Sequence, residues 1–287
     1  RWYMITNGQP WDNLKFDLEG VEEVIRKFFN TLYNTYSFFA LYANIDEFFY
    51  EEDEIPYEQR PEIDRWIISV LNSLIKEVDE LYNEYEITKA GRLIQDFVIE
   101  QLSNWYVRLN RKRYWGGEKN LDKLSAYQTL YECLITIVKL ASPLAPFYMD
   151  KIYRDLNSVT KKEKYESVHL VEFPIYNEKY IDKNLEEKMD LAQKITSMIL
   201  GLRKKVNIKV RQPLQKIIIP ITDQDFIKKF EEVKNLILSE VNVKEVEFID
   251  DKNLLLIKKI KPNFKKLGPT YGKLMKQITT ALSQLSQ

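Results

Sequence analysis

The sequence predicts a mainly α-helical fold: an antiparallel helical bundle followed by a small α+β module. Two patterns lead to this prediction. Between residues 17 and 156, apolar side chains recur at three- and four-residue steps in long segments joined by modest loops, and such helices pack against one another in antiparallel fashion. Beyond residue 206 the period changes, and short β-branched runs at 216–221, 243–249 and 254–260 have the length of strands.

The composition is typical of a water-soluble globular protein. The 287 residues are 45% hydrophobic and 30% charged, which allows one large or two ordinary domains with apolar cores. No apolar run approaches the roughly 18 residues of a membrane span, and the first residues lack the features of a signal peptide, so we expect a cytoplasmic protein without a membrane partner. Because the chain does not begin with Met, we expect it to be part of a longer protein. Its one cysteine, Cys133, lies in an apolar helical pattern and is expected to be a buried thiol in a reducing compartment.

The net charge is zero, but the charges are unevenly distributed. Residues 1–100 hold 9 Lys and Arg against 21 Asp and Glu, whereas residues 101–287 hold 34 against 22. Such an asymmetry suggests that the second part faces a polyanion. It is equally consistent with an acidic first part that faces another protein domain.

The first segments lead into the bundle. Residues 1–16 are aromatic, carry turn signals and are interpreted as the end of a connecting segment. A helix with a wide apolar surface is predicted at 17–44, followed by an acidic loop at 51–54 and a second helix at 64–85. The core-facing seam of that second helix consists of Trp66, Ile67, Val70, Leu74, Val78, Leu81 and Tyr85.

The longest predicted helix covers residues 88–115, with the hydroxyl of Thr88 as its N-cap acceptor. Gly116 and Gly117 follow a basic last turn and are expected to end the helix. The apolar side consists of Ala90, Leu93, Phe97, Gln101 or Leu102, Trp105 and Leu109.

The opposite side of this helix has a distinctive composition. It carries an amide, three cations and an indole at α-helical spacing, from Asn104, Arg108, Arg111, Lys112 and Trp115. An amide can hydrogen-bond a base edge, cations can bind phosphates, and an indole can stack on an unpaired base. The alternative is a solvated face whose cations complement the helix dipole, with the Trp side chain in the core.

The rest of the chain follows from the same signals. Further helices are predicted at 121–140, 147–156, 184–206, 225–240 and from 272 onwards. Residues 158–175 are interpreted as a basic loop with a short extended piece at 167–174. The single histidine, His169, lies there and is expected to be structural, since no cysteine cluster or nucleophile accompanies it.

No sequence pattern for catalysis or metal binding is present. The chain has only 8 Gly and no glycine-rich phosphate loop, and it contains no HExxH, GxSxG or EF-hand pattern and no cysteine pair for zinc. The sequence alone therefore predicts a binding module without a catalytic residue, a metal or a cofactor. Two further basic clusters are either phosphate contacts or solvated surface. They comprise Arg203, Lys204, Lys205, Lys209 and Arg211, and Lys258, Lys259, Lys261, Lys265 and Lys266.

Several blocks of sequence are together more specific than any single motif. They include RWYMITNGQPWDNLKF at 1–16, DRWIISVLNSLI at 64–75, LSNWYVRLNRKRYW at 102–115 and RKKVNIKVRQPL at 203–214. In this order, and over essentially the whole chain, they resemble the isoleucyl-tRNA synthetase family of class I aminoacyl-tRNA synthetases. The third block is similar to the family's anticodon-binding helix region. The fourth favours isoleucine over the valyl-, leucyl- and methionyl-tRNA synthetases, which share the helical architecture.

The resemblance implies a tRNA-binding piece of a ligase. The parent enzyme would join isoleucine to its tRNA with ATP and Mg²⁺; the HIGH and KMSKS signatures of the family's catalytic domain are not in this chain. The piece itself would be non-catalytic and would need no cofactor. Its implied partners are the anticodon stem-loop of an isoleucine tRNA and the catalytic domain, but neither DNA nor a membrane. The implied division is the end of a connector at 1–16, the anticodon-binding bundle at 17–180, and a C-terminal helix with the α+β module at 181–287.

The resemblance also implies roles for individual residues. Asn104 would bind a base edge, Trp115 would be the stacking platform, and Trp105 on the apolar side is expected in the core. Phosphates or a base edge would be contacted by Arg108, Arg111, Lys112 and Arg113, with further tRNA contacts from Arg203, Lys204, Lys205 and Arg211. One alternative is a helical protein-interaction scaffold with a merely solvated basic face. Another is the equivalent region of a valyl-, leucyl- or methionyl-tRNA synthetase.

Overall fold

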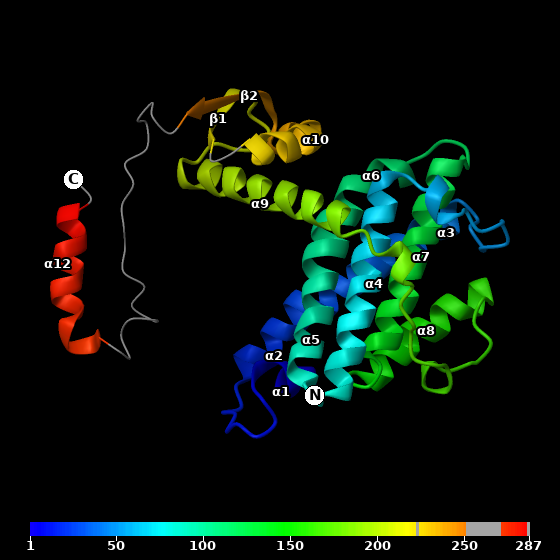
Figure 1. The fold of residues 1–287 in the computed structure, drawn as a ribbon. Helices are drawn as coiled ribbons and strands as arrows, with labels where there is room; N and C mark the ends of the chain where they lie inside the picture. The colour runs from blue at the N-terminus through cyan, green and yellow to red at the C-terminus, as the bar shows by residue number, and fades with distance from the viewer. Residues whose placement is uncertain (222–223, 251–270, 286–287) are drawn as a thin grey trace. The chain divides into compact units, whose positions relative to one another are not determined.

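A computed structural model describes residues 1–221, 224–250 and 271–285. The chain forms two compact units, Arg1–Met189 and Asp190–Gln287, here called the helical unit and the C-terminal unit. Their boundary falls inside one helix, α9 (Lys183–Lys205). The predicted fold class is confirmed, since helices dominate and the described strands form one small sheet (Figure 1). The assignment of separate roles to 1–16, 17–180 and 181–287 stays a prediction.

The helical unit is a bundle of long helices. Its α-helices are α1 (Trp2–Asn7), α2 (Leu18–Val24), α3 (Asn30–Ile45), α4 (Glu62–Asn83), α5 (Ile87–Asp96), α6 (Arg108–Tyr114), α7 (Leu121–Ala141) and α8 (Pro146–Thr160). Two π-helical segments, η1 (Ile25–Phe29) and η3 (Phe97–Val107), join α2 to α3 and α5 to α6; the 3-10 turns are η2 (Tyr57–Gln59), η4 (Val168–Leu170) and η5 (Glu178–Tyr180). In Figure 1, α4 and α7 run beside the helix formed by α5, η3 and α6, and this is the predicted bundle.

The core of the helical unit is built around α7, whose side chains are buried on nearly every side. Leu130, Leu134 and Val138 are completely buried. Cys133 is also completely buried, as predicted, and desolvation raises the pKa of its thiol well above the usual value. The thiol is therefore a small apolar group in a packed core.

The predicted seam of α4 is confirmed for most of its members, and wrong for one. Trp66, Ile67 and Val78 are buried. Tyr85 is 82% exposed and has a φ of 61°, because the helix has already ended at Asn83. The apolar period continued past the end of the helix, and no Gly or Pro marks that end in the sequence.

Residues 1–16 are an integral part of the helical unit. Trp2 is buried and stacks on Phe28 with 4.1 Å between ring centroids, and its indole N–H donates to Gln95 at 3.1 Å. The short helix α1 packs against α5, which the sequence analysis did not predict. The Thr88 hydroxyl donates to the carbonyls of Ile5 and Gly8 at 2.8 and 3.1 Å. Thr88 is therefore not the N-cap of the long helix; it lies inside α5 and holds α1 against it.

The long helix is continuous from Ile87 to Tyr114, as predicted, but its middle is π-helical. In a π-helix each N–H bonds a carbonyl five residues earlier, so one turn holds more residues than in an α-helix. Spacings of three and four therefore do not define a common face across η3. They do so within α6, where the cations lie.

The loop predicted at 158–175 begins later, because α8 continues to Thr160; residues 161–175 form the loop, and the piece at 167–174 contains the 3-10 turn η4 and no strand. The carboxylate of Asp150 in α8 accepts from the Ser167 hydroxyl at 2.7 Å and the Val168 N–H at 2.9 Å. Burial alone would raise the pKa of Asp150, but these bonds and the neighbouring Arg154 lower it. His169 is exposed in this turn.

The C-terminal unit contains a βαβ arrangement. Its elements after α9 are β1 (Leu214–Ile221), α10 (Gln224–Val241), β2 (Val243–Asp250), the 3-10 turn η6 (Gly272–Leu274) and α12 (Met275–Leu285). β1 and β2 are parallel, with Ile217 opposite Val246, and α10 packs on them. The strands predicted at 216–221 and 243–249 and the helix predicted at 225–240 are thus confirmed. The run at 254–260 and the Lys258–Lys266 cluster lie outside the described residues.

Candidate nucleic-acid interface

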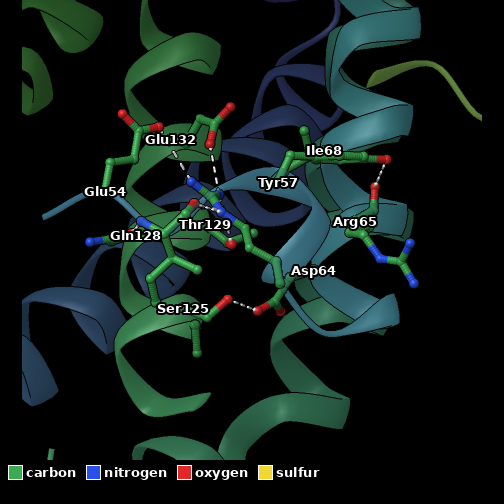
Figure 2. A network of polar contacts seen from close by, with 12 residues as sticks. Glu54, Tyr57, Asp64, Arg65, Ile68, Ser125, Gln128, Thr129 and Glu132 are labelled. Carbon is green, nitrogen blue, oxygen red and sulfur yellow. Dashed lines mark hydrogen bonds and ion pairs between the residues drawn. The ribbon is translucent and has the colours of Figure 1, made fainter. Parts of the chain in front are cut away.

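A buried carboxylate anchors the C-terminal half of the long helix. Asp64, in the first turn of α4, is completely buried and accepts four hydrogen bonds. Tyr106 donates its hydroxyl at 2.8 Å, Ser125 of α7 donates its hydroxyl at 2.6 Å, and the guanidinium of Arg113 donates at 2.6 and 2.8 Å. Figure 2 shows Asp64 and Ser125 facing each other between their helices. These bonds tie η3, α6, α4 and α7 together at one point.

Arg113 is occupied by the protein itself. In addition to Asp64, it donates to the Asn110 side chain at 3.0 Å and to the side chain and the carbonyl of Asp122 at 3.0 and 2.7 Å. These five hydrogen bonds equal the five N–H groups of a guanidinium. Desolvation lowers the pKa of Arg113, but the bonds to Asp64 and its charge outweigh this and raise the pKa. Because its donors already have internal acceptors, we assign Arg113 a structural role, and its predicted phosphate contact stays untested.

A second polar network orders the acidic loop beside α7. The guanidinium of Arg60, a residue only 4% exposed, donates to Thr129 at 3.1 Å and to Glu132 at 3.0 Å. Figure 2 shows Glu54 and Glu132 converging on this point. The side-chain amide of Gln128 bonds the backbone of the loop at Asp53 and Ile55. The acidic loop is therefore a fixed part of the helical unit.

The remaining predicted contacts of the long helix are exposed along its C-terminal part, and we call this set the basic helix face. It comprises Asn104, Arg108, Arg111, Lys112 and Trp115, all exposed. The Arg108 Nε donates to the Asn104 carbonyl at 2.8 Å, and its guanidinium lies 5.5 Å from the centroid of the Trp105 ring. Within the described ranges, the side chains of Arg111 and Lys112 form no hydrogen bond or ion pair.

The two Trp residues of this region have different environments. Trp105 is 5% exposed and belongs to the core, as expected. Trp115 is 55% exposed and immediately follows the end of α6. Gly116 and Gly117 come next with φ values of 65° and 78°, so glycine ends the helix as predicted. An indole in this position has an accessible face for a stacked base.

The second predicted cluster, in the C-terminal unit, also combines one buried arginine with exposed cations. Arg203 is 3% exposed, and its guanidinium donates to the carbonyls of Lys209, Gln212 and Asn242 at 3.2, 3.0 and 3.0 Å. We therefore assign Arg203 a structural role, and its predicted tRNA contact stays untested. Exposed cations of the same cluster are Lys204, Lys205, Lys209 and Arg211.

The sequence analysis missed the residues that support the basic helix face. Asp64 is separated from Tyr106, Arg113 and Ser125 by 42, 49 and 61 residues. No local pattern links partners so far apart. One signal was available: Asp64 lies two residues before Trp66, at the start of the apolar seam, and an Asp in such a place is seldom buried without a partner.

The described residues offer neither a cluster of metal ligands nor a membrane-spanning helix. No group of three or more His, Cys, Asp and Glu side chains there is placed to hold a metal ion. None of the helices in that part of the chain is long and apolar enough to cross a membrane.

Comparison with known proteins identifies related sequences over the whole chain. Residues 64–218 match the family model described as the anticodon-binding domain of tRNA ligase. The chain is 64% identical over 287 residues to the isoleucine–tRNA ligase of Bacteroides fragilis, covering 100% of this chain and 25% of that protein. It is 59% identical over 285 residues to the isoleucine–tRNA ligase of Cytophaga hutchinsonii (99% and 26%), and 41% identical over 290 residues to that of Clostridium tetani (100% and 27%). The chain thus spans about a quarter of the length of the curated relatives it matches.

Proposed function

The chain belongs to the family of anticodon-binding domains of tRNA ligases, and we propose that it binds the anticodon stem-loop of an isoleucine tRNA as part of a longer isoleucine–tRNA ligase. The observation that carries the proposal is the basic helix face, which lies within the matched residues. The choice of an isoleucine tRNA is supported by the three relatives named above, each called isoleucine–tRNA ligase and matched over 99–100% of this chain.

The chemistry of the basic helix face suits an unpaired RNA loop. Anticodon bases are splayed out, so their edges are open to hydrogen bonds and their faces to stacking. Arg111 and Lys112 supply exposed cations for phosphates, and Asn104 supplies an amide for a base edge. Trp115 supplies an exposed indole at the end of α6. Arg108 lies between Asn104 and Lys112 on the same helix and completes the set.

Two further roles are proposed outside this face. Lys204, Lys205 and Arg211 are exposed in the C-terminal unit and are proposed as further phosphate contacts. The joining of isoleucine to tRNA, with ATP and Mg²⁺, is proposed for the longer ligase. No residue of this chain is assigned to that chemistry.

An equilibrium titration with a labelled isoleucine anticodon stem-loop tests the proposal. We expect the wild type to bind it more tightly than a scrambled loop of the same length, and to lose affinity between about 50 and about 200 mM salt as counterions are displaced. Trp115→Ala should weaken binding of the cognate loop by about 1–3 kcal/mol, the range for one stacked base. Arg111→Ala should weaken binding to both loops and reduce the salt dependence by about one counterion.

Lys151→Ala is the matched control, since Lys151 is an exposed cation of α8, which lies away from α6 in Figure 1. It should leave the affinity unchanged. A folded protein that binds neither loop at low salt would refute the proposal and favour the helical protein-interaction scaffold. Equal binding to both loops would leave a basic surface without base readout.

A further inference from the structure

The backbone on both sides of Trp115 is fixed, although its side chain is exposed. Tyr114, directly before it, is completely buried and donates its hydroxyl to the Ala126 carbonyl at 2.8 Å. One residue earlier, Arg113 is bound to Asp64 and Asp122. An exposed aromatic side chain at the end of a helix ordinarily has a frayed backbone beneath it. Here the last turn is held by buried bonds.

After Trp115, the chain is held by a lysine of the neighbouring helix. Lys123, in the first turn of α7, is 2% exposed, and its ammonium donates to the Gly116 carbonyl at 3.2 Å. The same ammonium forms an ion pair with Asp46 at 2.5 Å. Asp46 follows the end of α3 and also accepts the hydroxyl of Tyr127 at 2.5 Å. Gly116 is thereby connected to α3 and α7 through one buried cation.

The turn that follows Trp115 consists of two glycines in a left-handed backbone conformation. Gly116 and Gly117 both have positive φ, and a Cβ atom at either position would meet nothing within 4 Å. Glycine is therefore required by backbone conformation, not by space. Two adjacent glycines are intrinsically free to move. The bond from Lys123 restrains the first of them directly after Trp115.

A lysine is an unusual choice for a merely structural tether. Burying an ammonium costs free energy unless it is paired and hydrogen-bonded, and here both Asp46 and Gly116 are needed to satisfy it. What the arrangement gives is a held backbone directly after an exposed indole. Binding a base then requires little further ordering of the protein, which raises affinity.

We infer that Lys123 is a positioning residue which, through the Gly116 carbonyl and Asp46, holds Trp115 in the orientation that receives one unpaired base. The inference rests on the proposed function, because it assigns the ligand of Trp115 as a nucleotide of the stem-loop. Lys123 itself touches no RNA. Its contribution is the ordering of the platform before the base arrives.

A double-mutant cycle tests whether Lys123 acts through Trp115. Affinity for the cognate stem-loop is measured for the wild type, Lys123→Met, Trp115→Ala and the double variant. We expect Lys123→Met to weaken binding at least about fivefold when Trp115 is present, and by less than about twofold in the Trp115→Ala background. Lys139→Met is the matched control: Lys139 is an ion-paired lysine near the other end of α7, and it should change neither affinity.

Each other outcome overturns the inference. An equal loss in both backgrounds would mean that Lys123 only supports the fold, and no loss in either would mean that the platform needs no tether. If Lys123→Met does not fold, Asp46→Asn removes the same ion pair at constant side-chain size and takes its place in the cycle. Fluorine NMR of 5-fluorotryptophan protein without RNA gives an independent readout. The Trp115 resonance, assigned by Trp115→Phe, should report a more mobile side chain in Lys123→Met.

An unchanged Trp115 resonance would refute the tether even if the stem-loop binds. A more mobile Trp115 side chain in a protein that binds no stem-loop would refute the proposed function and, with it, the assigned ligand.

Discussion

Replacing Arg113 with alanine is expected to lower the free energy of unfolding of the helical unit by about 3–5 kcal/mol, the range observed when one partner of a buried ion pair is removed. Asp64 has no exposed surface, and Arg113 supplies two of its four hydrogen bonds. In the variant, a buried carboxylate would keep only the hydroxyls of Tyr106 and Ser125. Its negative charge would then have lost its guanidinium counterion.

Urea unfolding followed by circular dichroism at neutral pH measures this effect, with the transition of the helical unit analysed separately from that of the C-terminal unit. Arg111→Ala is the matched control, two residues away on the same helix but exposed; it should change stability by less than about 0.5 kcal/mol. Equal shifts of the urea midpoint of the helical unit in Arg113→Ala and in Arg111→Ala would contradict a structural role for Arg113. In RNA binding the order should be reversed, because Arg111 is the proposed phosphate contact.

Replacing Arg203 with alanine is expected to destabilise the C-terminal unit by about 2–4 kcal/mol, since each hydrogen bond to a charged group contributes about 1.5–3 kcal/mol and the losses are not fully additive. Its guanidinium bonds three carbonyls, two in the segment between α9 and β1 and one directly before β2. The variant would leave those carbonyls without their donor.

Hydrogen exchange of the backbone amides in β1 and β2 measures this loss, because both strands start next to the carbonyls that Arg203 holds. Exchange should accelerate in Arg203→Ala and stay at the wild-type rate in Lys204→Ala, whose side chain is exposed. Unchanged exchange in both variants would contradict the assignment of Arg203 to the interior. Reduced stem-loop affinity in Lys204→Ala, with normal exchange, would support the surface role of its neighbour.

Arg113 and Arg203 show why a basic cluster is an incomplete guide to a binding surface. Each lies within a run of cations, RLNRKRY and RKK, and the sequence analysis treated every member alike. An arginine differs from its neighbours only through the acceptors that the fold brings to it. Those acceptors lie as far as 49 residues away for Arg113 and as far as 39 residues away for Arg203.

The sequence by itself determined most of the elements and the exposed side of the long helix. Apolar periodicity and glycine placement are local properties, and they predicted the helices, the strands β1 and β2, the stop at Gly116 and the burial of Cys133. Only the tertiary structure decided which polar side chains form hydrogen bonds and ion pairs in the interior. Thr88 fixes α1 instead of capping a helix, and Asp64 and Lys123 hold the turn that carries Trp115. The physical reason is that helix formation depends on neighbours within one turn, whereas the pairing of a buried charge depends on whichever distant helix packs against it.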